Sequence, residues 1–434
     1  MFFLYNAVLL FPRLGGAVLG AWAKRSTSPT AREWLDRLGH YRQDRGREAD
    51  VWVQAASVGE VRVAWRLVRA LETARPATRI LLTTTTRTGQ KLAASLGQGA
   101  AVDLAFFPLD FPPAVRRALG AMRPRVLALV ETEIWPNLLR ECGRAHVRTI
   151  IVNGRVSPRC FRRYRMVRPL IRRALEHVDL ACVQTDEDRS RFLALGLSPD
   201  RVRVSGNMKY DLPPEPPPDQ VERFRVSLGF GPTRWRPGED SSSDPLMVAG
   251  STAEGEDHLV LEAFRLARNE LPRSRLILAP RHPERFAAAA EEARRQGFSV
   301  GFRTSSLHGE AAPSPDVLVL DTMGELPLAY AAAQAAFVGG SLVAAGGQNM
   351  LEPASAGLPP IFGPHTENFR EPAERLLNAQ AALRVSDPHE LAEAFTRCLG
   401  DAAWTHSAGE RARRAVMRAA GATDRCARAI QELL

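Results

Sequence analysis

Residues 51–71, VWVQAASVGEVRVAWRLVRAL, place a strand, a turn and a helix in direct succession. The apolar run Val51–Ala56 predicts a short buried strand. Beyond the turn at Ser57–Gly59, apolar residues recur with helical spacing up to Leu71. This is the repeating unit of a parallel α/β sheet, whose ligands bind outside the carboxyl ends of the strands.

Glu60 lies just beyond the carboxyl end of this strand, in the first turn of the predicted helix. A carboxylate that faces the ligand crevice can accept a proton from an incoming hydroxyl group. Gly59 has no side chain and would let a ligand approach the backbone closely. The alternative is that Glu60 only complements the helix dipole, a contribution of about 0.3–1 kcal/mol.

The same alternation continues through the first half of the chain. Nearly continuous Val, Ile and Leu runs separated by helical patterns predict a parallel sheet with helices on both faces. The expected strands are Val51–Ala56, Arg79–Thr84, Arg125–Val130, Arg148–Val152, Leu180–Gln184 and Arg201–Ser205. The expected helices are Glu60–Ala74, Gly89–Leu96, Pro112–Met122, Ile134–Arg144, Phe161–Glu176 and Glu187–Leu195.

A Pro- and Ser-rich stretch, Asp211–Asp244, interrupts this rhythm and predicts a linker with a short helix around Val221–Leu228. The alternation then restarts, which predicts a second parallel sheet and a cleft between two doubly wound domains. The expected strands are Leu246–Gly250, Arg275–Ala279, Phe298–Phe302, Val317–Leu320, Ala335–Val338, Pro360–Phe362 and Ala382–Val385. The expected helices are Glu256–Glu270, Pro283–Arg295, Glu325–Ala333, Asn349–Ala356, Phe369–Leu377, Pro388–Leu399 and a last stretch from about His406 to Leu434.

These patterns divide the chain into five segments. They are an N-terminal segment (1–25), a first domain (26–211), a linker (212–244), a second domain (245–405) and a C-terminal helix (406–434). The total of 434 residues agrees with two domains.

The net charge of +10 favours anionic partners, namely nucleic acid, acidic lipid or phosphorylated substrates, without choosing among them. The five cysteines show no CxxC spacing, so neither a disulfide framework nor a zinc site is indicated. The nine histidines form no HExxH or HxH cluster, and no protein-bound metal is expected.

Residues 1–23 are almost uncharged except for Arg13, and a basic stretch begins at Lys24. About 20 apolar residues can cross a bilayer, and the basic residues beyond them would keep the rest in the cytoplasm. Pro12 and the Gly15-Gly16 pair weaken a spanning helix, so an interfacial amphipathic helix and a buried first helix are alternatives. A cleaved signal peptide is disfavoured, because the basic residues follow the apolar run.

Small and charged residues follow four expected strands of the second half, so they are predicted to converge on one edge of the sheet. Ser251 lies in a small, hydroxyl-bearing turn that suits a phosphate or a sugar. Arg281, after Pro280, offers a planar fork to a phosphate. Gly324 permits close backbone contact, and Glu325 opens a helix whose free amides can hold an anion or a ribose.

The fourth segment, Phe337–Ala354, is the strongest of these signals. Its glycines would let a ligand lie on backbone amides, and Asn349 starts a helix on which Glu352 could accept both hydroxyls of a ribose. Gly-rich turns usually only close a strand–helix unit, but four such segments in one domain favour nucleotide-sugar binding. There is no GxxxxGK[ST], which excludes a P-loop nucleotidase, and no GxGxxG after the first strand, which argues against a dinucleotide enzyme.

The chain resembles the 3-deoxy-D-manno-octulosonic acid (Kdo) transferases of Gram-negative bacteria over nearly its whole length. The apolar N-terminal segment is a further trait of that family. The matching motifs, in the family's order, are ASVGEV (56–61), ETEIWPN (131–137), GNMKYD (206–211), GE (255–256), PRHPER (280–285), MGEL (323–326), GGQNMLEPA (346–354) and GPH (363–365).

The resemblance implies a GT-B glycosyltransferase with two Rossmann-like domains that transfers Kdo from CMP-Kdo to a lipid A precursor (lipid IVA) in lipopolysaccharide synthesis. It also implies inversion at the transferred carbon, no metal or cofactor, and action on the cytoplasmic face of the inner membrane. By the same resemblance, Glu60 matches the catalytic base, while Glu131 or Glu133 and Lys209 line the cleft. The residues that match the CMP-binding set are Pro280, Arg281, Met323, Gly324, Glu325, Asn349 and Glu352.

The residues themselves suggest how such a site could work. Like-charged Glu131 and Glu133 would raise the pKa of Glu60 toward neutrality, or could pair with Arg155. Lys209 could pair with a carboxylate or phosphate of the donor. Trp135 is expected to pack rather than to stack on a sugar.

The sequence departs from the family pattern at Ala253 and Gln348, where many members carry histidine, and in the length of the stretch 232–244. Two alternatives remain. The first is another enzyme of this architecture that uses a UDP-sugar, such as a lipid-linked GlcNAc transferase or an epimerase; a comparison of CMP and UDP binding would separate it. The second is a non-enzymatic, basic nucleic-acid-binding or scaffold protein, which the lack of a recognisable nucleic-acid module disfavours.

Overall fold

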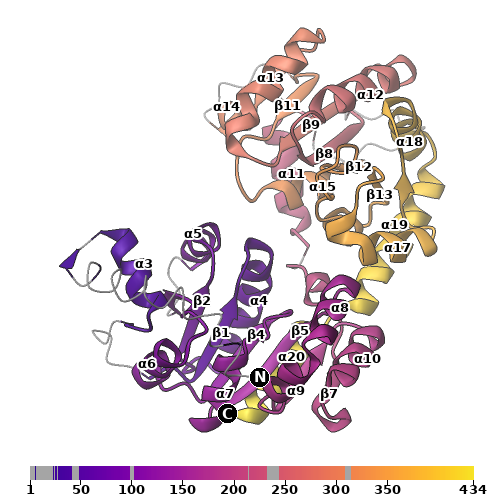
Figure 1. Cartoon of the computed structure of the whole chain (residues 1–434). Helices are drawn as coiled ribbons and strands as arrows, with labels where there is room; N and C mark the ends of the chain where they lie inside the picture. The colour runs from indigo at the N-terminus through magenta and orange to yellow at the C-terminus, as the bar shows by residue number, and fades with distance from the viewer. Residues whose placement is uncertain are drawn as a thin grey trace. The chain divides into compact units, whose positions relative to one another are not determined.

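The computed structural model describes residues 28–41, 48–97, 102–213, 215–231, 244–307 and 314–434, together with Tyr5, Ala23, Arg25 and Ser26. The chain forms two compact units (Figure 1). The first comprises Met1–Asp211 and Ala419–Leu434, and the second comprises Leu212–Arg418. A seven-stranded sheet forms the centre of each unit.

The sheet of the first unit is parallel throughout and has the order β3-β2-β1-β4-β5-β6-β7. The order reverses between β1 and β4, which makes this pair the topological switch point at which α/β sheets bind ligands. The strands are β1 (Val51–Ala55), β2 (Ile80–Thr84), β3 (Val102–Phe106), β4 (Val126–Val130), β5 (Arg148–Gly154), β6 (Leu180–Val183) and β7 (Val202–Val204).

Helices cover both faces of this sheet, because successive side chains of a strand point to opposite sides. Val51 and Val53 of β1 pack with α4, α5 and α20, whereas Trp52 packs with α6, α7, α9 and α10. The helices are α3 (Pro29–Arg37), α4 (Val58–Ala74), α5 (Arg87–Leu96), α6 (Pro112–Met122), α7 (Pro136–Arg144), α8 (Pro158–Met166), α9 (Arg168–Leu175), α10 (Asp186–Leu195) and α20 (Ala422–Leu433), with 3-10 turns η1 (Pro199–Arg201) and η2 (Met208–Tyr210).

The second unit repeats the architecture with the order β10-β11-β9-β8-β12-β13-β14, again all parallel. Here the order reverses between β8 and β12, so these two strands form the second switch point. The strands are β8 (Leu246–Thr252), β9 (Arg275–Pro280), β10 (Val300–Phe302), β11 (Val317–Val319), β12 (Ala335–Val338), β13 (Pro360–Phe362) and β14 (Leu383–Arg384).

The second sheet is also covered on both faces. Met247 of β8 packs with α12, α13 and α18 on one face, and Val248 packs with α11 and α15 on the other. The helices are α11 (Pro218–Ser227), α12 (Asp257–Glu270), α13 (Phe286–Arg295), α14 (Arg303–Leu307), α15 (Leu326–Ala332), α16 (Leu351–Ser355), α17 (Arg370–Asn378), α18 (Pro388–Gly400) and α19 (Ala402–Ala419), with 3-10 turns η3 (Pro283–Arg285) and η4 (Glu367–Phe369).

Most expected strands and helices are present, with shifts of one to a few residues at their ends. The strand β3 was not expected from the sequence. The last stretch, expected as one helical run, is two helices, because Gly421 adopts a left-handed φ of 87° between α19 and α20. The final helix, α20, packs on α4 and β5 of the first unit, an arrangement that the sequence does not signal.

The membrane-associating helix expected at residues 1–23 falls almost entirely outside the described residues. Within the described part of the chain, no helix combines the length and hydropathy that a membrane span requires.

Candidate functional site

Glu60 lies at the carboxyl end of β1, in the first turn of α4. Ser57 caps this helix, and its hydroxyl oxygen accepts a hydrogen bond from the amide of Glu60 at 3.4 Å. In return, the Glu60 carboxylate accepts hydrogen bonds from the amide of Ala56 (2.7 Å) and from the Ser57 hydroxyl (3.1 Å). This reciprocal arrangement is a variant of the capping box that uses the amide before the N-cap residue, and it fixes the carboxylate on the ligand-binding edge of the sheet.

The pKa of Glu60 is raised to about 7, mainly by burial and also by the negative charges of Glu133 and Glu131, while the hydrogen bonds from Ala56 and Ser57 act in the opposite direction. The sequence predicted the direction of this shift from the like charges. The structure shows that removal from water is the larger cause. At neutral pH the group therefore exists in comparable amounts as acid and as base, which suits proton transfer.

Glu131 and Glu133 follow β4, the neighbour of β1 at the switch point. Glu133 accepts hydrogen bonds from the indole of Trp135 (2.8 Å) and from the side-chain amide of Gln54 (3.4 Å). Burial also raises the pKa of Glu133. Glu131 adopts a left-handed φ of 61°, an unusual conformation for a residue with a side chain.

Lys209 lies in the turn after β7, and its ammonium nitrogen is 3.9 Å from a carboxylate oxygen of Glu131. Hydrogen bonds hold this turn in place: Arg66 donates to the carbonyls of Met208 and Lys209, and Asn153 accepts from the amide of Met208 at 2.9 Å. The structure thus brings together the four residues expected on the acceptor side, Glu60, Glu131, Glu133 and Lys209.

Two further residues belong to this cluster: Trp135, which was expected to pack, and Gln54, which was not singled out from the sequence. Gln54 is a fully buried glutamine inside β1, and its side chain links the Thr83 and Thr85 hydroxyls with Glu133. A polar side chain in the middle of an apolar strand is the signal that could have indicated it. Trp135 packs against Phe107 as expected, and it also donates to Glu133.

The residues expected to bind the donor lie at or just beyond the carboxyl ends of β8, β9, β11 and β12, which are neighbours in the second sheet. Ser251 has a left-handed φ of 58°, and Pro280 is the buried last residue of β9. Arg281 lines a cavity of about 720 Å³ next to the start of α12. The other charged and imidazole groups around this cavity are Glu254, Asp257, His258, His282, Glu284, Arg285, Glu292 and Arg295.

The Gly-rich loop after β12 corrects one expectation. The fully buried carboxylate of Glu256 accepts hydrogen bonds from the amides of Gly340 (2.6 Å), Ser341 (3.0 Å) and Leu342 (2.9 Å). These amides were expected to hold a ligand, but a side chain of the protein already occupies them. This contact could not be predicted from the sequence, because Glu256 looks like an ordinary acid at a helix start.

Glu325 is held by Arg303, which donates to both carboxylate oxygens at 2.9 and 2.8 Å. The hydroxyl of Thr322 donates to it as well, and these partners lower the pKa of Glu325. The adjacent Met323 is 68% exposed, and Gly324 adopts a φ of 90° with open space around its Cα. In the turn 322–325 the carboxylate of Glu325 is therefore held in place, and the apolar side chain of Met323 is exposed.

Asn349 and Glu352 are joined at the start of α16, where the Asn349 side-chain amide donates to Glu352 at 2.9 Å. Burial raises the pKa of Tyr330 well above its usual value, and the negative charge of the nearby Glu352 raises it further. The carboxylate is therefore oriented by Asn349, as a group that accepts ribose hydroxyls would have to be.

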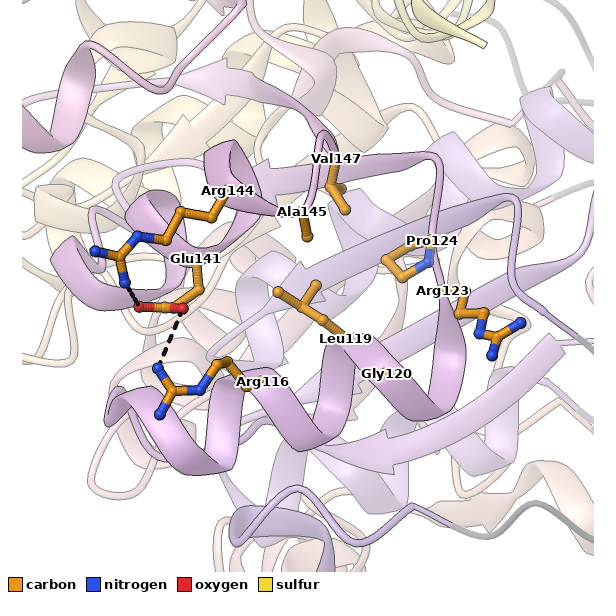
Figure 2. A pocket seen from close by; sticks show the side chains of 9 residues that line it. All are labelled: Arg116, Leu119, Gly120, Arg123, Pro124, Glu141, Arg144, Ala145 and Val147. Carbon is orange, nitrogen blue, oxygen red and sulfur yellow. Dashed lines mark hydrogen bonds and ion pairs between the residues drawn. The ribbon is translucent and has the colours of Figure 1, made fainter.

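A second cavity, of about 610 Å³, lies at the opposite, amino-terminal edge of the first sheet, between α6 and α7 (Figure 2). Its floor is apolar, with Leu119 and Val147. Arg116 and Arg144 flank the buried Glu141 at 3.5 and 2.9 Å. Because these charges are paired within the protein, the cavity has the character of a structural ion-pair site, remote from Glu60.

Among the described residues, no three His, Cys, Asp or Glu side chains are placed to hold a metal ion.

Sequence comparisons with known proteins place the chain in one family. The family model of "3-Deoxy-D-manno-octulosonic-acid transferase (kdotransferase)" matches residues 32–212. The chain is 37% identical over 395 residues to the 3-deoxy-D-manno-octulosonic acid transferase of Bordetella pertussis, covering 89% of this chain and 88% of that protein. It is 34% identical over 351 residues to the enzyme of the same name from Haemophilus influenzae, and the match covers 80% of this chain and 78% of that protein.

The fold is shared with solved glycosyltransferases. A glycosyltransferase from Rickettsia africae superposes with a TM-score of 0.57 at 12% identity, covering 89% of this chain and 98% of that chain. The two parallel α/β units thus resemble the GT-B fold.

Proposed function

Since the chain belongs to the 3-deoxy-D-manno-octulosonic acid (Kdo) transferase family, and is therefore a glycosyltransferase, we propose that it transfers Kdo from CMP-Kdo to a lipid A precursor, lipid IVA, with inversion of configuration. The observation that carries the proposed mechanism is the Glu60 carboxylate, held at the switch point with a pKa of about 7.

In the proposed reaction, a hydroxyl oxygen of the acceptor attacks the anomeric carbon of Kdo. The new carbon–oxygen bond forms as the bond to the CMP phosphate breaks, and Glu60 takes the hydroxyl proton. Glu131 and Glu133 keep Glu60 weakly acidic, so that it is a base near neutral pH. Lys209, oriented by Glu131, would offer its positive charge to an anionic group of either substrate.

The second unit supplies groups that suit the donor. Arg281 lies at the end of β9 with its guanidinium on a cavity, where it would contact the phosphate of CMP. Glu352, oriented by Asn349, would accept the ribose hydroxyls. Because Glu256 fills the Gly340–Leu342 amides, the donor would contact the strand ends and side chains rather than this loop.

We further propose that the protein works on the cytoplasmic face of the inner membrane, without nucleic-acid partners. The apolar stretch of residues 1–23, the basic residues that follow it and the net charge of +10 support this location, since apolar and electrostatic attractions to an anionic membrane add.

The test is transfer of radiolabelled Kdo by the wild type, Glu60→Gln and the control Glu72→Gln, which lies on the same helix. Glutamine also serves in a capping box, so Glu60→Gln should keep its fold while its transfer rate falls by about 10²–10⁴-fold. Glu72→Gln should match the wild type. Near-normal turnover of Glu60→Gln would remove Glu60 as the base, and transfer from a UDP-sugar instead of CMP-Kdo would overturn the proposed donor.

A further inference from the structure

The helix pair α8–α9 and the residues just before it form a dense cluster of positive charge on the first unit. Between residues 155 and 175 the sequence contains eight arginines and neither aspartate nor glutamate. All eight arginines are exposed, and no ion pair within the described part of the chain involves them. They are Arg155, Arg159, Arg162, Arg163, Arg165, Arg168, Arg172 and Arg173.

The corner between the two helices is apolar and faces solvent. Met166, the last residue of α8, is 84% exposed, and Val167, which separates α8 from α9, is 42% exposed. Phe161 and Tyr164, by contrast, are half-buried and pack on the core of the first unit. The helix α8 therefore has an inner apolar face, an outer basic face and an exposed apolar end.

Acidic residues near this surface do not neutralise it. Glu176, which directly follows α9, is exposed and offsets one of the eight positive charges. The others, Asp186, Glu187 and Asp188, are on α10, a neighbour of both α8 and α9 (Figure 1). Glu187 is paired with Arg191, and Asp188 is buried, where it accepts a hydrogen bond from the amide of Val156 at 2.8 Å. The outer face of α8–α9 therefore keeps a net positive charge.

This surface adjoins the catalytic edge of the first sheet. The Tyr164 hydroxyl donates to the carbonyl of Thr132 at 3.4 Å, and the Thr132 hydroxyl donates to the carbonyl of Arg155. Thr132 lies between Glu131 and Glu133, the neighbours of Glu60. A partner bound at the outer face of α8 would thus lie next to the acid–base cluster.

We propose that the outer face of α8–α9 docks on a bilayer that contains anionic phospholipids, with the arginines on the phosphate headgroups and Met166 and Val167 inserted among the acyl chains. Arginine recognises phosphate through its planar fork, and an apolar tip surrounded by basic residues is the arrangement of interfacial membrane binding. The inference deepens the proposed function, on which it rests, because it names the surface that would bring Glu60 to a lipid acceptor.

The test measures binding of the full-length protein to phosphatidylcholine vesicles with and without phosphatidylglycerol. The variant Arg159→Glu/Arg162→Glu/Arg163→Glu reverses three exposed charges and keeps residues that favour a helix. Each basic residue near an anionic leaflet contributes roughly fivefold in affinity, so the variant should bind the anionic vesicles on the order of a hundredfold more weakly at low salt. Binding to the neutral vesicles should be unchanged.

The matched control is Arg75→Glu/Arg125→Glu, two exposed arginines at the amino-terminal edge of the same sheet. It should bind anionic vesicles like the wild type. Met166→Asp should weaken binding to both kinds of vesicle, since it removes the inserted side chain. Equal losses in the control and in the α8 variant, or no loss in either, would overturn the proposal, as would preferential binding of the wild type to an RNA oligomer over the anionic vesicles.

Transfer assays separate this inference from the proposed function. With the acceptor in neutral detergent micelles, the α8 variant should transfer Kdo like the wild type, whereas with the acceptor in anionic vesicles it should be slower. If the wild type transfers no Kdo in micelles, the proposed function fails, whatever the vesicle binding shows. If the α8 variant loses transfer in micelles as well, the arginines serve the reaction itself and the docking surface is refuted.

Discussion

At the scale of single residues, Glu60 combines two roles that usually belong to different side chains. As the acid of a capping box it stabilises the start of α4, and as a half-buried carboxylate with a raised pKa it is poised as a base. A pKa raised in the folded state means that this group stabilises the fold most below pH 4.5 and loses that contribution as the pH rises through about 7. The stability lost is the cost of holding an ionised carboxylate away from water, because the hydrogen bonds from Ala56 and Ser57 favour the ionised form.

The pH dependence of transfer follows from the same shift. The base must be deprotonated, so kcat/KM should rise with pH and reach half its maximum near pH 7, the pKa of Glu60. The charge of Glu133 is one of the causes that raise this pKa, so Glu133→Gln should move the midpoint to lower pH. The measurement is the pH profile of kcat/KM, because its midpoint is independent of any loss in maximal rate.

Glu72→Gln is the control, since Glu72 lies on α4 and is not among the groups that shift the pKa of Glu60. Its midpoint should coincide with that of the wild type. A midpoint that stays near pH 7 in Glu133→Gln would show that the charge of Glu133 does not contribute to the raised pKa.

At the scale of elements, the Gly-rich loop after β12 owes its shape to a carboxylate from another segment. Glu256 lies before α12, yet it accepts hydrogen bonds from three consecutive amides of the loop. Gly339 is also required, because a Cβ there would come within 2.5 Å of the Thr252 backbone at the end of β8. The close approach of β8 and β12 at the switch point depends on both features.

Glu256→Ala should therefore destabilise the second unit strongly. Four amides, those of Ala253, Gly340, Ser341 and Leu342, lose their acceptor, and each unsatisfied buried group costs about 1–3 kcal/mol, so a loss of about 3 kcal/mol or more is expected. CMP binding, measured by calorimetry, should weaken as the loop loses its order. The control is Glu254→Ala, an exposed acid two residues away, which should change the free energy of unfolding by less than about 0.5 kcal/mol. An equal effect of both substitutions would contradict the role of Glu256.

The strand–helix units themselves were predictable, because strands buried on both faces give apolar runs such as Val126–Val130. The strand β3 escaped prediction because it lies at the edge of its sheet and is only partly buried, so Val102–Phe106 lacks such a run. The gathering of Glu60, Glu131 and Glu133 followed from the rule that parallel strands share one carboxyl edge. The contacts of Glu256 and Arg303 could not be predicted in this way, since tertiary packing alone decides which distant segment binds the groups of a turn.

At the scale of the whole molecule, the C-terminal residues Ala419–Leu434 belong to the first unit, although they follow the second unit in sequence. After α19 the chain returns to the first unit, and Asp211, the last residue of that unit's first segment, accepts hydrogen bonds from the amides of Gly421 and Thr423 (2.5 Å) at the start of α20. The helix α20 then fills the face of the first sheet beside α4. The last residues of the chain are thus structural parts of the unit that contains Glu60.

Ile430→Ala should consequently destabilise the first unit, although Ile430 follows the entire second unit in sequence. Ile430 is fully buried in the core that contains Val53 and Val130, and truncation of such a side chain costs about 2–5 kcal/mol. Hydrogen exchange resolves the two sheets: amides of β1, β4 and β5 should exchange at least about 30-fold faster, and those of β8, β9 and β12 should be unchanged. The control Glu432→Ala removes only an exposed ion pair with Arg203 and should have little effect in either sheet. Faster exchange confined to the second sheet, or equal in both, would mean that α20 does not belong to the stability of the first unit.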